Sequence, residues 1–305
     1  MKKIVIIYIL LIITGSKIIA QQLPHFRNSH INHIYWNPAY IVNPETPNAI
    51  LNHRAQWVGF SGAPKISILT GKYNFREDMA AGVYMINDIT GISRKMEFCL
   101  NYAYLLKADK FNISFGLAWT ITQFNIIGTN ISLFDVNDQA VNMHLDDKTW
   151  KPDANAGIIF YSEIFYIGFA INQLLQSKYI FFNENDVPGT IESKRHYLLT
   201  GAYNFSNNKY RLSPFINNYY TPNTPYKFDI GLKYFNMKRF FSSLVYSSKD
   251  AIVFSAGYKY EKFFFEYSFD IITSRIRNVS SGAHEISVGI FLSEEIRKGD
   301  TRPMF

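Results

Sequence analysis

The chain has 305 residues, of which 48% are hydrophobic and 17% aromatic, whereas only 18% are charged, below the roughly 25% found in soluble domains. The formal net charge of +7 is mild, and no basic stripe with interleaved aromatics occurs, so a nucleic-acid partner is not expected. A single cysteine, Cys99, excludes an internal disulfide, so stability is expected to come from the sheet and its packing.

The first twenty residues have the pattern of a secretory signal peptide. Lys2 and Lys3 form a short basic region, and an apolar run of ten residues follows from Ile4 to Ile13. Such a run is too short for a membrane-spanning helix, which needs about twenty residues. Small or polar residues lead to a cleavage site after Ala20, so residues 1–20 are predicted to be removed on export.

Residues 21–48 are polar, contain four prolines and show no sustained alternation. They are predicted to form an irregular N-terminal segment that lies in the periplasm or folds into the lumen of a barrel. Three histidines fall in this segment, His25, His30 and His33, but their asparagine and arginine neighbours are poor ligands for zinc. A metal site is therefore the less favoured interpretation, and no cofactor is expected.

From Ala49 onward, apolar residues alternate with polar or small ones, which is the period of a β-strand. The clearest stretch runs from Phe111 to Thr122. Its bulky positions are Phe111, Ile113, Phe115, Leu117, Trp119 and Ile121, with Asn, Ser, Gly, Ala and Thr between them. Each such segment is expected to have one apolar face and one small, polar face.

Alternation alone fits two architectures, a soluble sandwich with the apolar faces inward and a membrane barrel with these faces toward lipid. The polar faces are rich in small residues that suit a crowded barrel interior: Gly116, Ala118, Gly157, Gly168, Ala170, Gly231, Gly257 and Gly289. Tyrosines cluster near segment ends, as in interfacial girdles: Tyr102 and Tyr104, Tyr219 and Tyr220, Tyr258 and Tyr260. These features favour an all-β fold, an antiparallel transmembrane outer-membrane β-barrel, over the sandwich.

The alternating segments number about fourteen, an even count as in bacterial single-chain barrels. They lie near 49–58, 63–73, 79–88, 92–106, 111–124, 154–161, 164–172, 195–204, 210–219, 226–235, 239–247, 251–260, 262–271 and 284–292. Short connections such as 236–238 are predicted to be periplasmic turns, and the long polar ones at 125–152 and 177–194 extracellular loops. No linker divides the chain, so residues 49–305 are predicted to form one barrel domain without membrane-spanning helices.

Two groups of residues offer the side chains of a hydrolase. These are His284 and Glu285 beside Ser280 and Ser281, and His196 with Asp186. Nothing in their spacing fixes their relative orientation, and no nucleophile-elbow, metalloprotease or phosphate-binding motif occurs. A polar turn that opens the last strand is the favoured interpretation of the first group, and no enzymatic activity is predicted.

A series of short motifs runs along the mature chain. The first are Gln21-Gln22-Leu23-Pro24-His25-Phe26, Asn37-Pro38-Ala39-Tyr40, Arg54-Ala55-Gln56-Trp57-Val58-Gly59 and Gly62-Ala63-Pro64-Lys65. Later ones include Asp88-Ile89-Thr90-Gly91, Pro152-Asp153-Ala154-Asn155-Ala156-Gly157, Asn172-Gln173-Leu174 and Ser281-Gly282-Ala283-His284-Glu285-Ile286. In this order they resemble the PorP/SprF family of type IX secretion system membrane proteins over nearly the whole mature chain. Residues 27–36 depart from the Ser-Gln-rich, Met- or Phe-containing run usual in that family, so a partner that contacts this segment is expected to differ from the family's.

The resemblance implies a non-enzymatic outer-membrane barrel of Bacteroidota that works with the type IX secretion or gliding machinery. Its expected role is to support secretion or surface attachment of large proteins with a type B C-terminal sorting domain. Its expected partners are outer-membrane lipid and secretion components or a large secreted adhesin, with no small-molecule substrate. Candidate partner-binding or family-motif residues are Asn37, Pro38, Tyr40, Gln56, Trp57, Gly62, Pro64, His284 and Glu285. The alternative function is an outer-membrane porin or hydrophobic-solute channel.

Overall fold

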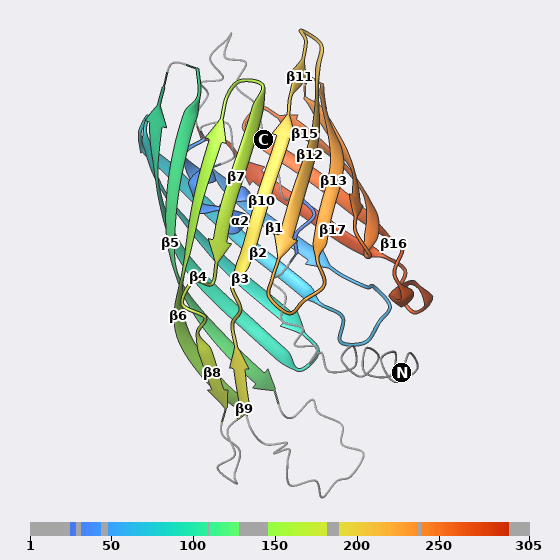
Figure 1. The fold of residues 1–305 in the computed structure, drawn as a ribbon. Coiled ribbons are helices and arrows are strands. Elements are labelled where there is room, and N and C mark those ends of the chain that lie inside the picture. The colour runs from blue at the N-terminus through green and yellow to red at the C-terminus, as the bar shows by residue number, and fades with distance from the viewer. Residues whose placement is uncertain are drawn as a thin grey trace, which may run out of the picture.

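The computed structural model describes residues 25–28, 32–43, 48–108, 110–127, 146–181, 189–236 and 239–292. Within them, fourteen antiparallel strands form a closed barrel (Figure 1). The barrel strands are β1 (Ala49–Ala55), β2 (Lys65–Arg76), β3 (Met79–Thr90), β4 (Ser93–Lys107), β5 (Asn112–Ile127), β6 (Asp146–Tyr161), β7 (Phe165–Asn172), β10 (His196–Tyr203), β12 (Tyr210–Tyr220), β13 (Lys227–Asn236), β14 (Phe240–Ser247), β15 (Ala251–Tyr260), β16 (Phe263–Ile272) and β17 (Ala283–Ile290). The remaining elements are α2 (His33–Trp36), η1 (Pro38–Val42), β8 (Lys178–Phe181), β9 (Gly189–Glu192), β11 (Phe205–Ser206) and η3 (Arg275–Asn278).

The barrel closes because its first and last strands pair. β1 lies between β2 and β17 and pairs with both over its full length. β10 pairs with β7, although β8 and β9 lie between them in the sequence, and it also pairs with β12. Every barrel strand therefore has a neighbour on each side, which satisfies backbone hydrogen bonds in lipid. The prediction of an antiparallel barrel of about fourteen strands is confirmed. None of the described helices is long and apolar enough to cross a membrane.

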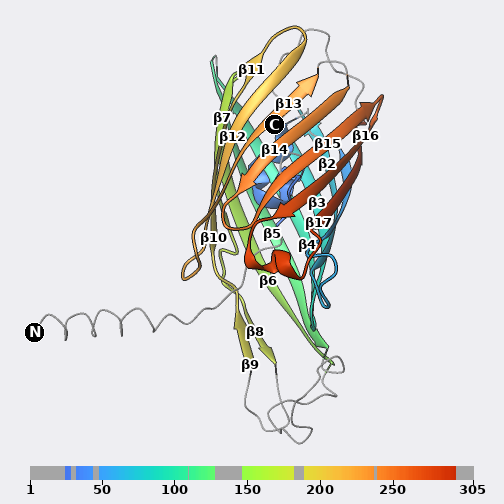
Figure 2. The ribbon, with the colours of Figure 1, turned by 90° about the vertical axis from the view of Figure 1, so that its right-hand side faces the viewer.

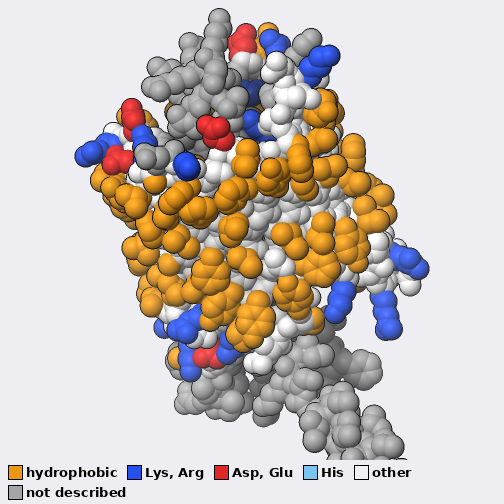
Figure 3. Space-filling view, turned by 45° about the horizontal axis from the view of Figure 1, so that its top comes forward, with side chains coloured by type: hydrophobic (Ala, Val, Ile, Leu, Met, Phe, Trp, Pro, Cys, Tyr) orange, Lys and Arg blue, Asp and Glu red, His pale blue; other side chains and the backbone are white. Residues whose placement is uncertain are grey.

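The alternating faces are oriented as in a membrane barrel. Leu51 and Leu117 are 57% and 65% exposed, whereas Arg54 and Glu285 are 1% and 0% exposed. Figure 3 shows the outward apolar side chains as a broad band, with Lys, Arg, Asp and Glu gathered above and below it. A soluble sandwich would bury the apolar face and expose the charges, so this arrangement excludes it.

Glycines on the inner wall make room for large neighbours. Phe215 stands directly opposite Gly231, Phe241 opposite Gly257, and Phe264 opposite Gly289. A Cβ atom at Gly289 would lie 2.0 Å from the ring of Phe264, and the other two glycines are similarly crowded. Inward aromatic rings thus cover glycines on the next strand, a pairing that helps to fix strand register.

The two mouths of the barrel differ. At one mouth, β2–β3, β4–β5, β6–β7, β13–β14 and β15–β16 are joined by short turns, and β1 begins and β17 ends there. We call it the short-turn mouth. The other, the long-loop mouth, carries the β1–β2 and β16–β17 loops and the hairpin β8–β9, which extends beyond the barrel at the bottom of Figure 1. Barrels of outer membranes place short turns in the periplasm and long loops outside.

Three details differ from the sequence-based predictions. β6 begins at Asp146, so residues 146–152 are strand and not loop. β5 and β6 remain paired as far as Ile127 and Asp146 and form a two-stranded ribbon there. Because the ribbon is rich in polar residues, apolar and polar positions do not alternate clearly in its sequence. The predicted loop at 177–194 contains β8 and β9.

Tyr219 was predicted to belong to an outer girdle with Tyr220. Its side chain points inward, because adjacent residues of a strand face opposite sides of the sheet.

Candidate functional site: a filled lumen and its long-loop mouth

The lumen holds the protein's own N-terminal segment. Residues 25–28 and 32–43, which we call the lumen segment, lie inside the wall, and α2 appears within the barrel in Figure 2. Phe26, Tyr35, Trp36 and Ile41 are buried and pack against inward residues of β2 to β5. The segment is therefore part of the core of the barrel.

Local chemistry shapes the turn between α2 and η1. The Asn37 side chain accepts a hydrogen bond from the backbone N–H of Ala39 at 2.9 Å and so caps η1. Pro38 occupies the first turn of η1, where a missing N–H costs nothing. The same Asn37 side chain donates to the backbone carbonyls of Ile158 and Phe169 at 3.4 and 3.3 Å. One residue thus ends one helix, begins the next and joins both to the wall.

Gly116 of β5 and Gly157 of β6 leave the space that this turn occupies, and we call this pair of glycines the seat of the turn. A Cβ atom at Gly116 would lie 2.2 Å from the backbone nitrogen of Ala39, and one at Gly157 would lie 1.9 Å from the side-chain oxygen of Asn37. These distances are far below van der Waals contact, so only glycine admits the segment at this depth. The Ser114 hydroxyl adds a hydrogen bond to the carbonyl of Ala39 at 2.7 Å.

Tyr40 fixes the segment to β7 and β10, which follow β6 in the sheet. Its hydroxyl lies 3.3 Å from the Thr200 hydroxyl, and its ring packs edge-on against Tyr166 and stacks on His33. Tyr40 is 3% exposed. The predicted motif residues Asn37, Pro38 and Tyr40 therefore bind the barrel wall, and their side chains are not accessible to a second protein in this conformation.

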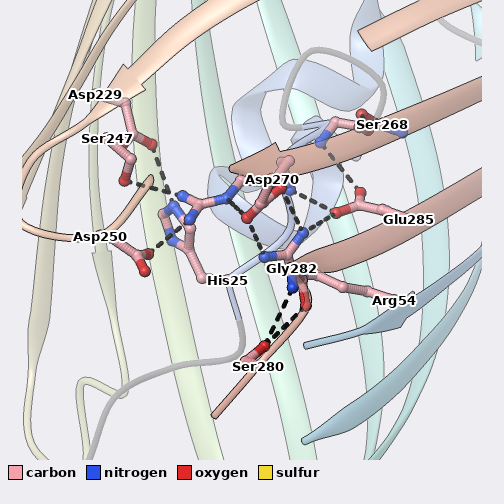
Figure 4. A network of polar contacts seen from close by, with 12 residues as sticks. His25, Arg54, Asp229, Ser247, Asp250, Ser268, Asp270, Ser280, Gly282 and Glu285 are labelled. Atoms are coloured by element: carbon pink, nitrogen blue, oxygen red, sulfur yellow. Dashed lines mark hydrogen bonds and ion pairs between the residues drawn. The ribbon is translucent and has the colours of Figure 1, made fainter. Parts of the chain in front are cut away.

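A buried network of ion pairs anchors the start of the lumen segment (Figure 4). The Arg27 guanidinium donates to Asp270 at 2.8 Å and to Asp250 at 2.6 Å. Arg54 of β1 donates to the same Asp270 at 2.7 Å and to Glu285 at 3.2 Å. Glu285 also accepts the backbone N–H of Arg27 at 2.8 Å. The network joins the segment to β1, β16, β17 and the β14–β15 turn.

Neighbouring residues extend this network. Asn28 donates to Ser287 at 2.8 Å, and His25 lies 3.1 Å from Asp229 of β13. Burial alone would raise the pKa of the Asp250 carboxyl in the β14–β15 turn, but the charges of Arg27 and Lys227 hold it well below its usual range. Asp250 is therefore ionised at neutral pH and pairs with a permanent cation.

The other predicted motif residues shape the β1–β2 loop at the long-loop mouth. Trp57 has a φ of 48° and Gly62 a φ of 74°, so the loop bends through left-handed conformations at both. The backbone N–H of Gln56 donates to the carbonyl of Pro64 at 2.9 Å, which closes the base of the loop. Gly62 accepts from Gly91 at 2.9 Å, which ties the loop to the β3–β4 turn.

The β1–β2 loop is also bonded to the β16–β17 loop. Val58 and Gly282 share a backbone hydrogen bond of 2.9 Å, and Ser281 donates to the carbonyl of Val58 at 2.8 Å. Beside these bonds Val58, Phe60 and Val279 expose apolar side chains. We call the three residues the apolar rim. It lies on two loops whose backbones are hydrogen-bonded to each other.

The residues proposed for a hydrolase do not converge. His284 and Glu285 occupy adjacent positions of β17 and face opposite sides of the wall. His284 lies outside, 2.7 Å from the Tyr267 hydroxyl, whereas Glu285 belongs to the internal network. His196 bonds to Thr221, and Asp186 lies outside the described residues. Among the described residues no group of three or more His, Cys, Asp or Glu is placed to hold a metal; His30 is not among them.

Of the residues in the ion-pair network that anchors the start of the lumen segment, only Glu285 was among the candidate residues predicted from the sequence. Arg27 and Asp270 are separated by 243 positions, and Arg54 was recognised as part of a motif but not as the partner of Glu285. Charged residues on the polar face of a barrel strand were the available signal, since each needs a partner when buried.

Comparisons with known proteins agree with the fold. Residues 18–290 match the family model described as type IX secretion system membrane protein PorP/SprF. The barrel is similar to the toluene transporter TbuX of Ralstonia pickettii, with a TM-score of 0.50 and 10% identity over 85% of this chain and 92% of that one. It is similar to the CymD monoaromatic hydrocarbon channel, with a TM-score of 0.50 and 12% identity over 87% and 94%. No curated protein sequence matches the chain.

The similarity to solved structures, at such low identity, concerns the fold alone. It places this chain among barrels of the outer membrane, in agreement with its apolar outer band. The family model spans the lumen segment, both loops of the apolar rim and all fourteen barrel strands. The chain belongs to the PorP/SprF family of type IX secretion system membrane proteins.

Proposed function

We propose that this barrel is a non-enzymatic component that supports secretion or cell-surface attachment of large proteins with a type B C-terminal sorting domain. The observation that carries the proposal is the lumen segment: the path through the barrel is occupied by the protein's own buried residues. A barrel filled in this way acts through its mouths, where it holds loops in fixed positions on either side of the membrane.

The packing of the lumen segment argues against a solute channel. Trp36 and Tyr40 lie across the interior, and the segment is held at one end by Arg27 and in the middle by Asn37. Opening a path would separate buried ion pairs and hydrogen bonds, which is costly in a low-dielectric interior. A porin or hydrocarbon channel would have to break these ion pairs and hydrogen bonds each time it opened.

The apolar rim at the long-loop mouth is the surface that we propose for the partner. Val58, Phe60 and Val279 are 37%, 46% and 56% exposed, and backbone hydrogen bonds fix the loops that carry them. A fixed loop loses little entropy when it binds, which favours affinity. Aromatic side chains are also the usual anchors of protein interfaces.

Export is part of the proposal. Residues 1–20 lie outside the described part of the chain, and we propose that they are a signal peptide removed after Ala20. N-terminal sequencing of the protein from outer membranes is expected to begin at or within a few residues of Gln21.

Deletion of the gene tests the proposed role. We expect one or a few large surface proteins to disappear from the cell surface and to be recovered inside the cell or degraded, as seen by surface proteomics. Uptake of small hydrophilic and aromatic solutes is expected to be unchanged. Normal surface display with reduced solute uptake would instead support a channel and would contradict the proposal.

Substitution of the rim tests the partner surface separately. Phe60→Asp is expected to reduce co-purification of the surface protein roughly tenfold or more, as for loss of an aromatic anchor. Barrel folding should not change, because Phe60 is an exposed residue of the β1–β2 loop and not part of a barrel strand. Leu175→Asp, at another exposed apolar position of the same mouth, is the matched control and should retain the partner. Equal loss in both variants would rule out a specific rim.

A further inference from the structure

The contacts of the lumen segment show the direction in which the chain crosses the barrel. At its start, His25 contacts Asp229, which is the third residue of β13, and Arg27 contacts Asp250 in the β14–β15 turn. Asn28 bonds to Ser287 of β17. β13 and β17 begin, and β14 ends, at the long-loop mouth. The segment therefore starts at that mouth.

The other end of the segment lies at the short-turn mouth. The carbonyl of Val42 accepts from the Asn74 side chain at 2.7 Å, close to the end of β2. Asn48 bonds to Lys72 and Ile290 through its backbone, and its side chain accepts from the backbone of Leu292. β1 then begins at Ala49. Between the two ends, Asn37 contacts Gly157 of β6 and Ala39 contacts Gly116 of β5.

We infer that the chain enters its own barrel through the long-loop mouth, at the end opposite to the start of β1 and the end of β17, so that a tag placed directly before His25 is accessible at that mouth. An N-terminal segment that only reached in from the short-turn mouth and returned would place residues 25–28 beside the ends of β2 and β17. The observed partners lie elsewhere: Asp270, the partner of Arg27, is near the long-loop end of β16, and Ser287, the partner of Asn28, is in the middle of β17.

The internal network explains why the crossing is stable. Two arginines, one from the segment and one from β1, share Asp270, and Glu285 accepts the backbone N–H groups of Arg27 and Asn28. Withdrawal of the segment would leave these buried carboxylates with a single cation.

Epitope insertion tests this orientation without any assumption about which mouth faces outward. One tag is inserted between Pro24 and His25, a second at Asn223 in the β12–β13 loop, and a third at Glu261 in the β15–β16 turn. Antibody binding to intact and to permeabilised cells is measured. The N-terminal tag is expected to behave as the tag at Asn223, and behaviour like the tag at Glu261 would overturn the inference.

A disulfide test covers the case in which a tag disturbs folding. In a Cys99→Ser background, the pair Asn28→Cys and Ser287→Cys is expected to crosslink, because the native side chains are 2.8 Å apart. The pair Asn28→Cys and Ser114→Cys is the control and is expected to remain reduced, since Ser114 bonds to Ala39 farther along the segment. Crosslinking of the control pair, or of neither pair, would overturn the inference. Both tests read the path of the chain, so they can succeed even if the proposed partner is wrong.

Discussion

Replacement of Arg54 by alanine is expected to destabilise the barrel by about 3–5 kcal/mol, the cost of breaking a buried ion pair from one side. Arg54 is 1% exposed and pairs with Asp270 and Glu285. Without it, Asp270 keeps the guanidinium of Arg27, whereas Glu285 keeps no cation and accepts only neutral donors such as the backbone N–H groups of Arg27 and Asn28. The expected result combines a lower folding stability with a looser start of the lumen segment.

Guanidinium unfolding in detergent micelles, followed by the gel mobility of unheated samples, measures this loss. Arg76→Ala is the matched control, because Arg76 pairs with Asp78 at 3.2 Å on the surface. Such exposed pairs contribute about 0–1 kcal/mol. If both variants unfolded at the same denaturant concentration, the internal network would not be stabilising and the account of the anchor would be wrong.

Replacement of Gly116 by alanine is expected to displace the lumen segment and cost about 1–3 kcal/mol, as for overpacking of a dense core. The added Cβ would lie 2.2 Å from the nitrogen of Ala39 and 2.3 Å from the carbonyl carbon of Pro38. Both are backbone atoms, so the clash cannot be relieved by rotation of a side chain. The turn between α2 and η1 has to move away from β5.

Trypsin cleavage after Arg27 reports the displacement, because Arg27 is buried in the seated segment. Native protein is expected to resist cleavage there, and Gly116→Ala should be cut faster under the same conditions, as followed by mass spectrometry. Gly201→Ala is the control, since a Cβ at Gly201 lies 3.6 Å from its nearest neighbour. Equal protection in all three proteins would show that the segment does not occupy this seat.

The strands were predictable from the sequence because each buries one face in lipid and the other in a crowded interior. Apolar and polar residues alternate clearly wherever a strand has lipid on one face and the barrel interior on the other, as in β5. This alternation is not recognisable in the ribbon that begins at Asp146 or in the four-residue strands β8 and β9. The hairpin β8–β9 extends beyond the barrel (Figure 1), where a strand no longer has lipid on one face and the lumen on the other.

The position of the N-terminal segment was not predictable beyond two alternatives, the periplasm and the lumen. Its local sequence has no period, and what holds it are partners more than 200 residues away, such as Asp270 and Glu285. The glycines that seat it were recognised only as signs of a crowded interior. That they accommodate Asn37 and Ala39 follows from the three-dimensional path alone.

Apart from His284, which lies on the outer face, the motif residues fall into two groups in the structure. Asn37, Pro38, Tyr40 and Glu285 hold the lumen segment inside the wall, whereas Gln56, Trp57, Gly62 and Pro64 shape the loop that carries Phe60. Residues of the first group should affect folding when replaced. Those of the second group should affect the geometry of the apolar rim.

Single-channel recording of the purified full-length protein in planar lipid bilayers tests the central claim, that the barrel is closed by its own chain. The account predicts no steady conductance above that of the bare bilayer, because the lumen segment fills the interior and is held by buried ion pairs. A large, constant conductance typical of an open barrel would contradict it.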